Sequence, residues 1–386
     1  MITRRHFTRN VLLAIGGAPV LGGLAACSDD GPPIPAGPAD LAGTYVPGLD
    51  ATIPEGASLR RVAHSKQVVA GTDHIWHSMP DGGACFAVPD GGWIYVSNCE
   101  NDRGDGGVGA LRFNAAGDIV DAYPILADTS RNCAGGKTPW GTWLSCEENG
   151  DEGQVYECDP TGQTVARVRP AMGSFNHEAA AVDPRNNRVY LTEDLGDGCL
   201  YRFTPDAGND LSAGTLEVAQ VHGMRLGWAR VPDPSAKRDP TRYQVPGAAR
   251  FRGGEGIVFG MRGTAGWVYF TTKGDNRVWG LNVDTDRLTV VYDASLVDKP
   301  ILTGVDNIEM SPNGELIVAE DGGDMQLVSL GADYQPVPLV TLHNQMRSEL
   351  AGPAFSPDGR RLYFSAQKSP TGDGDGGQTY ELTLPA

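Results

Sequence analysis

The chain has 386 residues and a formal net charge of −17 at pH 7. This acidic balance disfavours nucleic acids and anionic membrane surfaces as partners, because both repel a negatively charged protein. It is also the balance expected of a chain that binds hard cations. The seven cysteines show neither CxxC spacing nor a zinc-finger pattern, so one or two disulfides are compatible with the sequence but none is assigned.

The first residues predict export. Residues 3–7, Thr-Arg-Arg-His-Phe, form a twin-arginine signal, and the apolar stretch 11–26 that follows is too short for a membrane span. The stretch ends in a lipobox whose Cys27 would carry a lipid; an ordinary signal peptide with an incidental cysteine is the alternative. We expect a signal peptide at 1–26, a flexible Pro- and Gly-rich tether at 27–47, and a periplasmic or cell-surface protein. Its membrane attachment would be through the lipid alone.

The rest of the chain consists of short apolar runs separated by turns rich in Gly and Pro. Neighbouring runs are about 45–50 residues apart, except for one gap of about 78, and this is the period of four-stranded propeller blades. The aligned runs are 93–97, 142–145, 188–192, 267–271, 315–319 and 361–365. We predict an all-β fold, a single β-propeller over 48–386 with six blades of four antiparallel strands. The segment near 230–253 is read as a loop insertion, and the protein is expected to be a monomer.

An acid-rich motif recurs at one place in this repeat. It stands at Asn132–Asn149, Phe175–Asp194, Gly253–Phe259 and Asp306–Asp321. In a propeller the start of the innermost strand and the end of its partner lie on one face, so carboxylates from several blades would meet at one channel mouth. Cations would offset their mutual repulsion. Carboxylate and amide oxygens suit Ca²⁺ or Mg²⁺, whereas a cysteine thiolate suits a transition metal such as iron.

Each candidate ligand also has a structural interpretation, since acidic residues after strands are often turn residues. Metal ligation is favoured for four glutamates, because glutamate is a poor turn residue and the four recur at equivalent sites: Glu148, Glu178, Glu255 and Glu320. The alternative for Cys133 is a buried core thiol. For His177, a residue that orients its neighbour or caps a loop is favoured over direct ligation.

At these residues the chain resembles the alkaline phosphatases of the PhoX family, over about residues 81–367. The most specific segments are Cys133–Glu148, which reads C-x-G-G-K-T-P-W-G-T-W-x-x-C-E-E, and the His-Glu-Ala-Ala run at 177–180. The resemblance implies a β-propeller that holds iron (Fe³⁺) and calcium (Ca²⁺) ions over its channel. It implies that Cys133 is the thiolate in contact with iron. The further iron and calcium ligands that it implies are Glu148, Glu178, Glu255, Asp306, Asn307 and Glu320.

The reaction implied by the resemblance is metal-dependent hydrolysis of phosphate monoesters outside the cytoplasm, with a small phosphorylated molecule as the substrate. A cationic side chain should hold the phosphate. Arg252 is the first candidate, because it precedes the strand of Glu255, and Lys273 and Arg277 are the substitutes. The family places its phosphate-binding arginine two residues before a ligand glutamate, whereas Arg252 precedes Glu255 by three.

Two other functions remain open. One is a calcium-binding propeller lipoprotein without catalysis, which binds or senses a ligand. The other is a lactonase of the gluconolactonase type, a propeller that needs one Ca²⁺ and would give Cys133 no role. Iron content, ester turnover and dependence on Cys133 distinguish these functions from a phosphatase.

Overall fold

The computed structural model describes residues 43–385, which lie in one compact unit. The long elements of this part are all β-strands, and its helical elements are 3-10 turns of three residues. None of its helices has the length and apolar character needed to cross a membrane. The predicted signal peptide, Cys27 and most of the predicted tether lie outside the described residues. The last part of that tether, Gly43–Val46, forms strand β1.

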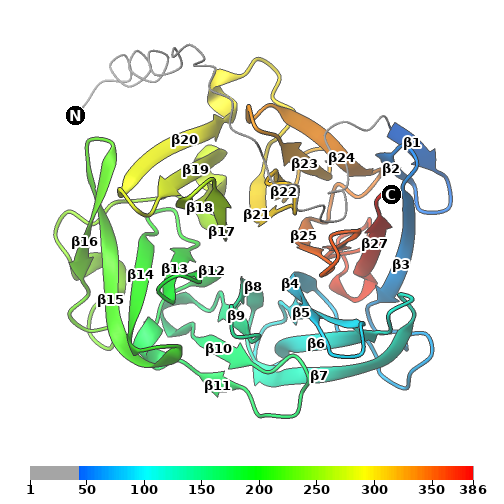
Figure 1. The fold of residues 1–386 in the computed structure, drawn as a ribbon, viewed down its shortest axis with the longest axis horizontal. Coiled ribbons are helices and arrows are strands. Elements are labelled where there is room, and N and C mark those ends of the chain that lie inside the picture. The colour runs from blue at the N-terminus through cyan, green and yellow to red at the C-terminus, as the bar shows by residue number, and fades with distance from the viewer. Residues whose placement is uncertain (1–42, 386) are drawn as a thin grey trace, which may run out of the picture. The chain divides into compact units, whose positions relative to one another are not determined.

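The strands form five antiparallel sheets arranged around a common centre (Figure 1). One sheet contains β4 (Pro80–Ala87), β5 (Trp93–Cys99), β6 (Gly106–Phe113) and β7 (Ile119–Thr129). The next contains β8 (Asn132–Lys137), β9 (Trp143–Glu147), β10 (Val155–Cys158) and β11 (Arg167–Val168). Another contains β25 (Leu350–Phe355), β26 (Arg361–Ala366), β27 (Gln378–Thr383) and β3 (Ser58–His64).

A six-stranded sheet has four strands in chain order and a hairpin at its outer edge. The four are β21 (Val305–Met310), β22 (Leu316–Glu320), β23 (Gln326–Leu330) and β24 (Pro336–Leu342). The hairpin of β1 and β2 (Ala51–Pro54) joins this sheet through the pairing of β2 with β24. The sequence did not predict these two strands, because β1 is short and exposed and depends on its pairing with β2.

The largest sheet has nine strands. It begins with β12 (His177–Asp183), β13 (Arg188–Glu193), β14 (Leu200–Ala207), β15 (Asp210–His222) and β16 (Arg225–Arg230). It continues with β20 (Arg287–Asp293), β19 (Arg277–Asn282), β18 (Ala265–Thr272) and β17 (Gly254–Arg262). A single residue pair, Arg225 with Arg287, joins its two halves. The sheets therefore differ from the predicted six separate blades of four strands, because β16 continues the third expected blade into the fourth.

The sequence-based expectation of an all-β, propeller-like fold is confirmed, and the six aligned runs coincide to within one residue with parts of strands β5, β9, β13, β18, β22 and β26. Six innermost strands contact one another in the circular order β4, β8, β12, β17, β21, β25 and back to β4. Apolar side chains fill the space between neighbouring sheets, as where Ile317 and Leu327 pack with Phe364. Burial of this kind contributes about 25 cal/mol per Å² of apolar surface.

Two further predictions concern the loop insertion near 230–253 and the pairing of the cysteines. The segment 231–253 joins β16 to β17 and contains only the short turn Thr241–Tyr243. Arg242 of that turn, which is nearly buried, pairs with Asp151 at 2.7 Å and with Glu193 at 3.1 Å and so holds the segment against the β12 side of the ring. The six cysteines of the described part are all unpaired.

Candidate metal centre

The same backbone irregularity begins each of the six innermost strands. In β12, His177 pairs with Glu193, but the next pair is Ala180 with Leu191, so one extra residue lies on β12. Corresponding register shifts occur at the starts of β4, β8, β17, β21 and β25. A β-bulge of this kind re-aims a side chain. In five of the strands the second residue lies at the bulge, and these residues are Asp81, Cys133, Glu178, Glu255 and Asp306, whereas in β25 the shift comes one residue later, after Ala351.

Small residues follow in the third position, because neighbouring inner strands pass close to one another. A Cβ atom at Gly256 would lie 2.6 Å from the Cα atom of Asn307, which no real contact tolerates. Asn307 is the exception among the third residues. Its Oδ1 accepts the Gly352 N–H at 2.6 Å, and its Nδ2 donates to Asp306 at 2.8 Å. The predicted ligand Asn307 therefore links two inner strands in this structure.

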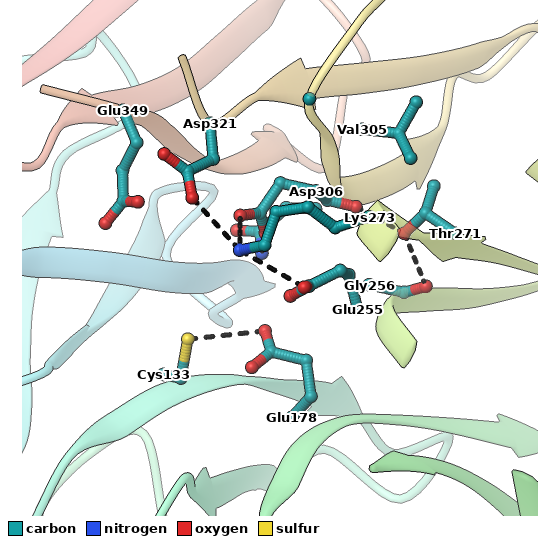
Figure 2. Close-up of polar contacts among 12 residues, drawn as sticks. Cys133, Glu178, Glu255, Gly256, Thr271, Lys273, Val305, Asp306, Asp321 and Glu349 are labelled. Carbon is teal, nitrogen blue, oxygen red and sulfur yellow. Dashed lines mark hydrogen bonds and ion pairs between the residues drawn. The ribbon is translucent and has the colours of Figure 1, made fainter. Parts of the chain in front are cut away.

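The second residues meet in a continuous arc of possible ligands. Four groups have ligand atoms within 4.8 Å of one another: Asp81/Glu100/Cys133, Cys133/Glu148/Glu178, Glu178/Glu255/Asp306 and Asp306/Asp321/Glu349. Adjacent groups share one residue each, namely Cys133, Glu178 and Asp306. Figure 2 shows Cys133 and Glu178 facing Glu255 and Asp306, with the Cys133 thiol 3.3 Å from a Glu178 carboxylate oxygen. We call these nine side chains the acidic cluster.

Residues just after the second strands complete the acidic cluster. Glu100, Glu148 and Asp321 each follow the last residue of β5, β9 or β22. The side chains of the last strand residues point away from the acidic cluster, because side chains alternate along a strand. The carboxylate of Glu320 accepts the backbone N–H groups of Thr303 at 2.7 Å and Gln326 at 3.1 Å. The structure therefore places the predicted ligand Glu320 outside the four groups and its neighbour Asp321 inside one of them.

This one-residue difference can be tested with two variants. Glu320→Gln should lower the free energy of unfolding by about 1–3 kcal/mol, because the amide cannot accept both backbone N–H groups. Its metal content should stay at the wild-type level. Asp321→Asn should instead lower the metal content with little loss of stability. Denaturant unfolding and elemental analysis measure the two quantities, and loss of metal in the Glu320 variant alone would contradict the assignment.

Charge in the acidic cluster is far from balanced. Its eight carboxylates contact three cationic side chains, Arg131, Lys273 and Lys368, which leaves a formal excess of five negative charges if all are ionised. Burial, with neighbouring carboxylates, raises the pKa of Glu178 and of Glu255 well above its usual range.

The pKa values of Glu148 and Asp306 shift in the same direction. Burial is the main cause for both, and it raises the pKa of Glu148 to about 8 and that of Asp306 to about 6. Lys273 opposes the rise at Asp306, and the nearby Glu100 carboxylate adds to the rise at Glu148. The thiol of Cys133 also has a pKa well above its usual range, because it is buried and lies near Asp81.

The predicted cationic residues occupy different environments. The Lys273 ammonium lies 3.1 Å from Glu255, 3.3 Å from Asp306 and 3.0 Å from Asp321, inside the acidic cluster (Figure 2). Arg277 pairs with Asp275 and Asp293 and contacts no member of the cluster. Arg252 is exposed. Its carbonyl accepts the Gly274 N–H at 2.9 Å, beside the Lys273 loop.

The buried His177 has a structural role in this arrangement. Its Nε2 contacts the Gly173 carbonyl at 3.0 Å, and its ring packs 3.6 Å from that of Phe175. Burial lowers its pKa to about 3, so the imidazole is neutral. The sequence favoured a structural role of this kind for His177 over direct ligation of a metal.

The sequence-based ligand list omitted four members of the acidic cluster and one residue beside it, namely Asp81, Glu100, Asp321, Glu349 and Gln367. Asp81 lies in Pro-Asp-Gly-Gly, which reads as a turn. Glu349 precedes β25 and has no counterpart in the repeat. Gln367 follows β26 at the place of Glu100 and Glu148, and its amide donates to Asp81 at 2.6 Å and to Glu100 at 2.7 Å.

The donor chemistry of the acidic cluster fits cations. Carboxylate oxygens are the preferred ligands of Ca²⁺, and a thiolate within the same arc suits iron better than calcium. Cations would also offset the charge excess, which adds to the effect of burial on the carboxyl pKa values. A cavity of about 380 Å³ continues along the inner strands beyond the cluster, lined mostly by small and apolar residues together with Lys137 and Glu309.

The protein therefore belongs to the class of all-β, propeller-like proteins. Its candidate metal centre is the acidic, thiol-containing cluster at the starts of the inner strands. Residues 106–295 match the family model described as alkaline phosphatase PhoX. The resemblance of the chain to the PhoX family is therefore confirmed over this segment.

Solved structures of other proteins have a similar fold. PhoX of Pseudomonas fluorescens, in complex with the transition-state analogue vanadate, is 16% identical in sequence, with a TM-score of 0.70 over 89% of this chain and 97% of that chain. A gluconolactonase from Xanthomonas campestris is 14% identical, with a TM-score of 0.54 over 92% of this chain and 99% of that one. No curated protein matches the chain in sequence.

Proposed function

We propose that this protein is a metal-dependent phosphatase that hydrolyses phosphate monoesters with iron and calcium held by the acidic cluster. The observation that carries the proposal is the position of Cys133, which belongs to two of the four ligand groups and so joins a soft ligand to a run of carboxylates. The match of residues 106–295 to the alkaline phosphatase PhoX family supports the same reaction.

The roles of the side chains follow from their positions. Cys133, Glu148 and Glu178 would hold iron, and the carboxylates from Glu255 to Glu349 would hold calcium. Bound cations would polarise the phosphoryl oxygens and offset the negative charge that develops during hydrolysis. Lys273 keeps Glu255, Asp306 and Asp321 close together and reduces their repulsion. Gln367 holds Asp81 beside Glu100.

The finer features of the architecture belong to the same proposal. We count the two halves of the nine-stranded sheet as two blades, since one residue pair joins them, which gives six blades around the channel. The protein is exported by the twin-arginine route and tethered by a lipid on Cys27, with the substrate as its small-molecule partner and no nucleic acid. It acts as a monomer.

The test is elemental analysis of protein exported by a host with the twin-arginine route, with p-nitrophenyl phosphate turnover measured on the same sample. Iron and calcium together with turnover would support the proposal. Calcium alone without turnover would contradict the proposal and favour a calcium-binding propeller without catalysis. Calcium with lactone hydrolysis would favour a lactonase.

Replacement of Cys133 separates the phosphatase from the lactonase. In Cys133→Ala we expect the iron content and the phosphatase rate to fall together, while calcium is lost to a smaller extent, because carboxylates alone still suit calcium. Cys85→Ala is the matched control, since Cys85 is a buried cysteine on β4 outside the ligand groups. Equal loss of both metals from the Cys133 variant would count against thiolate ligation.

A further inference from the structure

Three cationic side chains of the described part contact the acidic cluster, and they differ in how far the cluster occupies them. The ammonium group of Lys273 has three N–H donors and lies 3.0–3.3 Å from three carboxylates, so all of its donors are occupied. Lys368 lies 3.6 Å from the single carboxylate of Glu349. Arg131 is the one guanidinium among the three, and at 39% its side chain is the most exposed.

The backbone of Arg131 is fixed between two neighbouring sheets. Its N–H donates to the Asn101 carbonyl at 2.7 Å, and its own carbonyl accepts the Glu148 N–H at 2.8 Å. Its φ of 51° lies in the left-handed region, which non-glycine residues adopt at a cost and only where the surroundings hold them. Arg131 is therefore held firmly next to Cys133 and Glu148, two residues of the acidic cluster.

The guanidinium of Arg131 still has donors to offer. Its Nη2 lies 2.6 Å from Glu148 and 3.4 Å from Glu100, and its Nε lies 3.8 Å from the exposed Asp102. Residues 43–385 provide no hydrogen-bond partner for its Nη1. A planar guanidinium donates two parallel N–H groups to a phosphate, which an ammonium cannot do. The other two cations that contact the cluster, Lys273 and Lys368, are ammonium groups and are less exposed.

We propose that Arg131 binds the phosphate group of the substrate at the mouth of the acidic cluster and is the specificity residue for phosphate monoesters. This inference rests on the proposed phosphatase function. Arg131 takes the role that the sequence had suggested for Arg252, whose exposed side chain makes no hydrogen bond or ion pair within the described residues. Its contact with Glu148 also places the bound phosphate next to the ligand groups that share Cys133.

The experiment compares Arg131→Gln and Arg131→Lys with the wild-type holoenzyme. The control is Arg103→Gln, because Arg103 is exposed, lies on the neighbouring loop and has a similar backbone φ of 60°. In Arg131→Gln we expect kcat/KM for p-nitrophenyl phosphate to fall about 100-fold and inhibition by inorganic phosphate to weaken about 10-fold or more, at unchanged metal content. Arg131→Lys should keep part of the activity, and Arg103→Gln should match the wild type.

Three outcomes would overturn the role of Arg131: wild-type kinetics in Arg131→Gln, a loss of activity that only tracks a loss of metal, or the same defect in Arg252→Gln but not in Arg131→Gln. Absence of turnover in the metal-loaded wild type would instead refute the phosphatase function. Calorimetry with inorganic phosphate then decides the role of Arg131. Weaker binding in Arg131→Gln than in Arg103→Gln supports an oxyanion contact, and equal or absent binding overturns it.

Discussion

Replacement of Glu178 by glutamine is expected to abolish loading of the metal centre and to lower phosphatase turnover by about 100-fold or more, the effect that loss of one preorganised electrostatic group commonly has. Glu178 belongs to both central ligand groups and lies 3.3 Å from the Cys133 thiol. An amide keeps the size of the side chain but removes the charge that binds a cation. Elemental analysis and p-nitrophenyl phosphate kinetics measure the two effects.

The matched control for this variant is Glu309→Gln. Glu309 also lies on an innermost strand, and burial raises its pKa to about 7, but it belongs to none of the four ligand groups. Its replacement should leave metal content and turnover unchanged. A Glu178 variant that keeps its full metal complement and its fold would remove Glu178 from the set of ligands.

The metal-free protein is expected to lose stability as the pH rises. Carboxyls whose folded-state pKa is raised, such as Glu148 at about 8, hold a proton in the folded state above the pH at which the unfolded chain releases it. The unfolded state is therefore favoured increasingly between the ordinary carboxyl pKa and the raised one. Between about pH 5 and about pH 8 we expect the free energy of unfolding to fall by about 3 kcal/mol or more, since each unit of pKa shift corresponds to about 1.4 kcal/mol.

Denaturant unfolding of protein treated with a chelator, followed across this pH range, measures the effect. Calcium at about 1,000 times its dissociation constant should restore about 4 kcal/mol and flatten the pH dependence, because it binds the ionised carboxylates of the folded state. The Glu178→Gln variant should show a smaller loss without metal. A stability of the metal-free protein that stays constant or rises towards pH 8 would contradict the charge excess inferred for the acidic cluster.

The strands that follow a turn could be predicted from the sequence, because β-branched and aromatic runs at a regular spacing indicate propeller strands directly. Trp267–Thr271 and Arg361–Ser365 are examples that the structure confirms. Strand β16 could not be predicted as a bridge between halves of a sheet, since only the pair Arg225 and Arg287 makes that connection. Such a contact between distant segments leaves no periodic signal.

The acidic cluster could be predicted in part. Glu178 and Glu255 begin innermost strands and Glu148 follows a second strand, all within the acid-rich motif, and the structure brings the three together. Glu320 was selected in place of Asp321 because both end the same acid-rich motif. Side chains alternate between the two faces of a strand, so the residue that faces the channel depends on where the strand ends. A shift of that end by one residue exchanges the positions of the two side chains.

Closure of the ring determines when the metal centre can exist at all. Strand β3, near the start of the described chain, completes the sheet of β25–β27 at its end. The amide of Gln367 reaches Asp81, which precedes it by 286 residues. A ribosome must therefore finish almost the whole chain before the last carboxylates find their partners, and a truncated product would carry acids that repel one another. A full metal complement would thus require a completely synthesised chain.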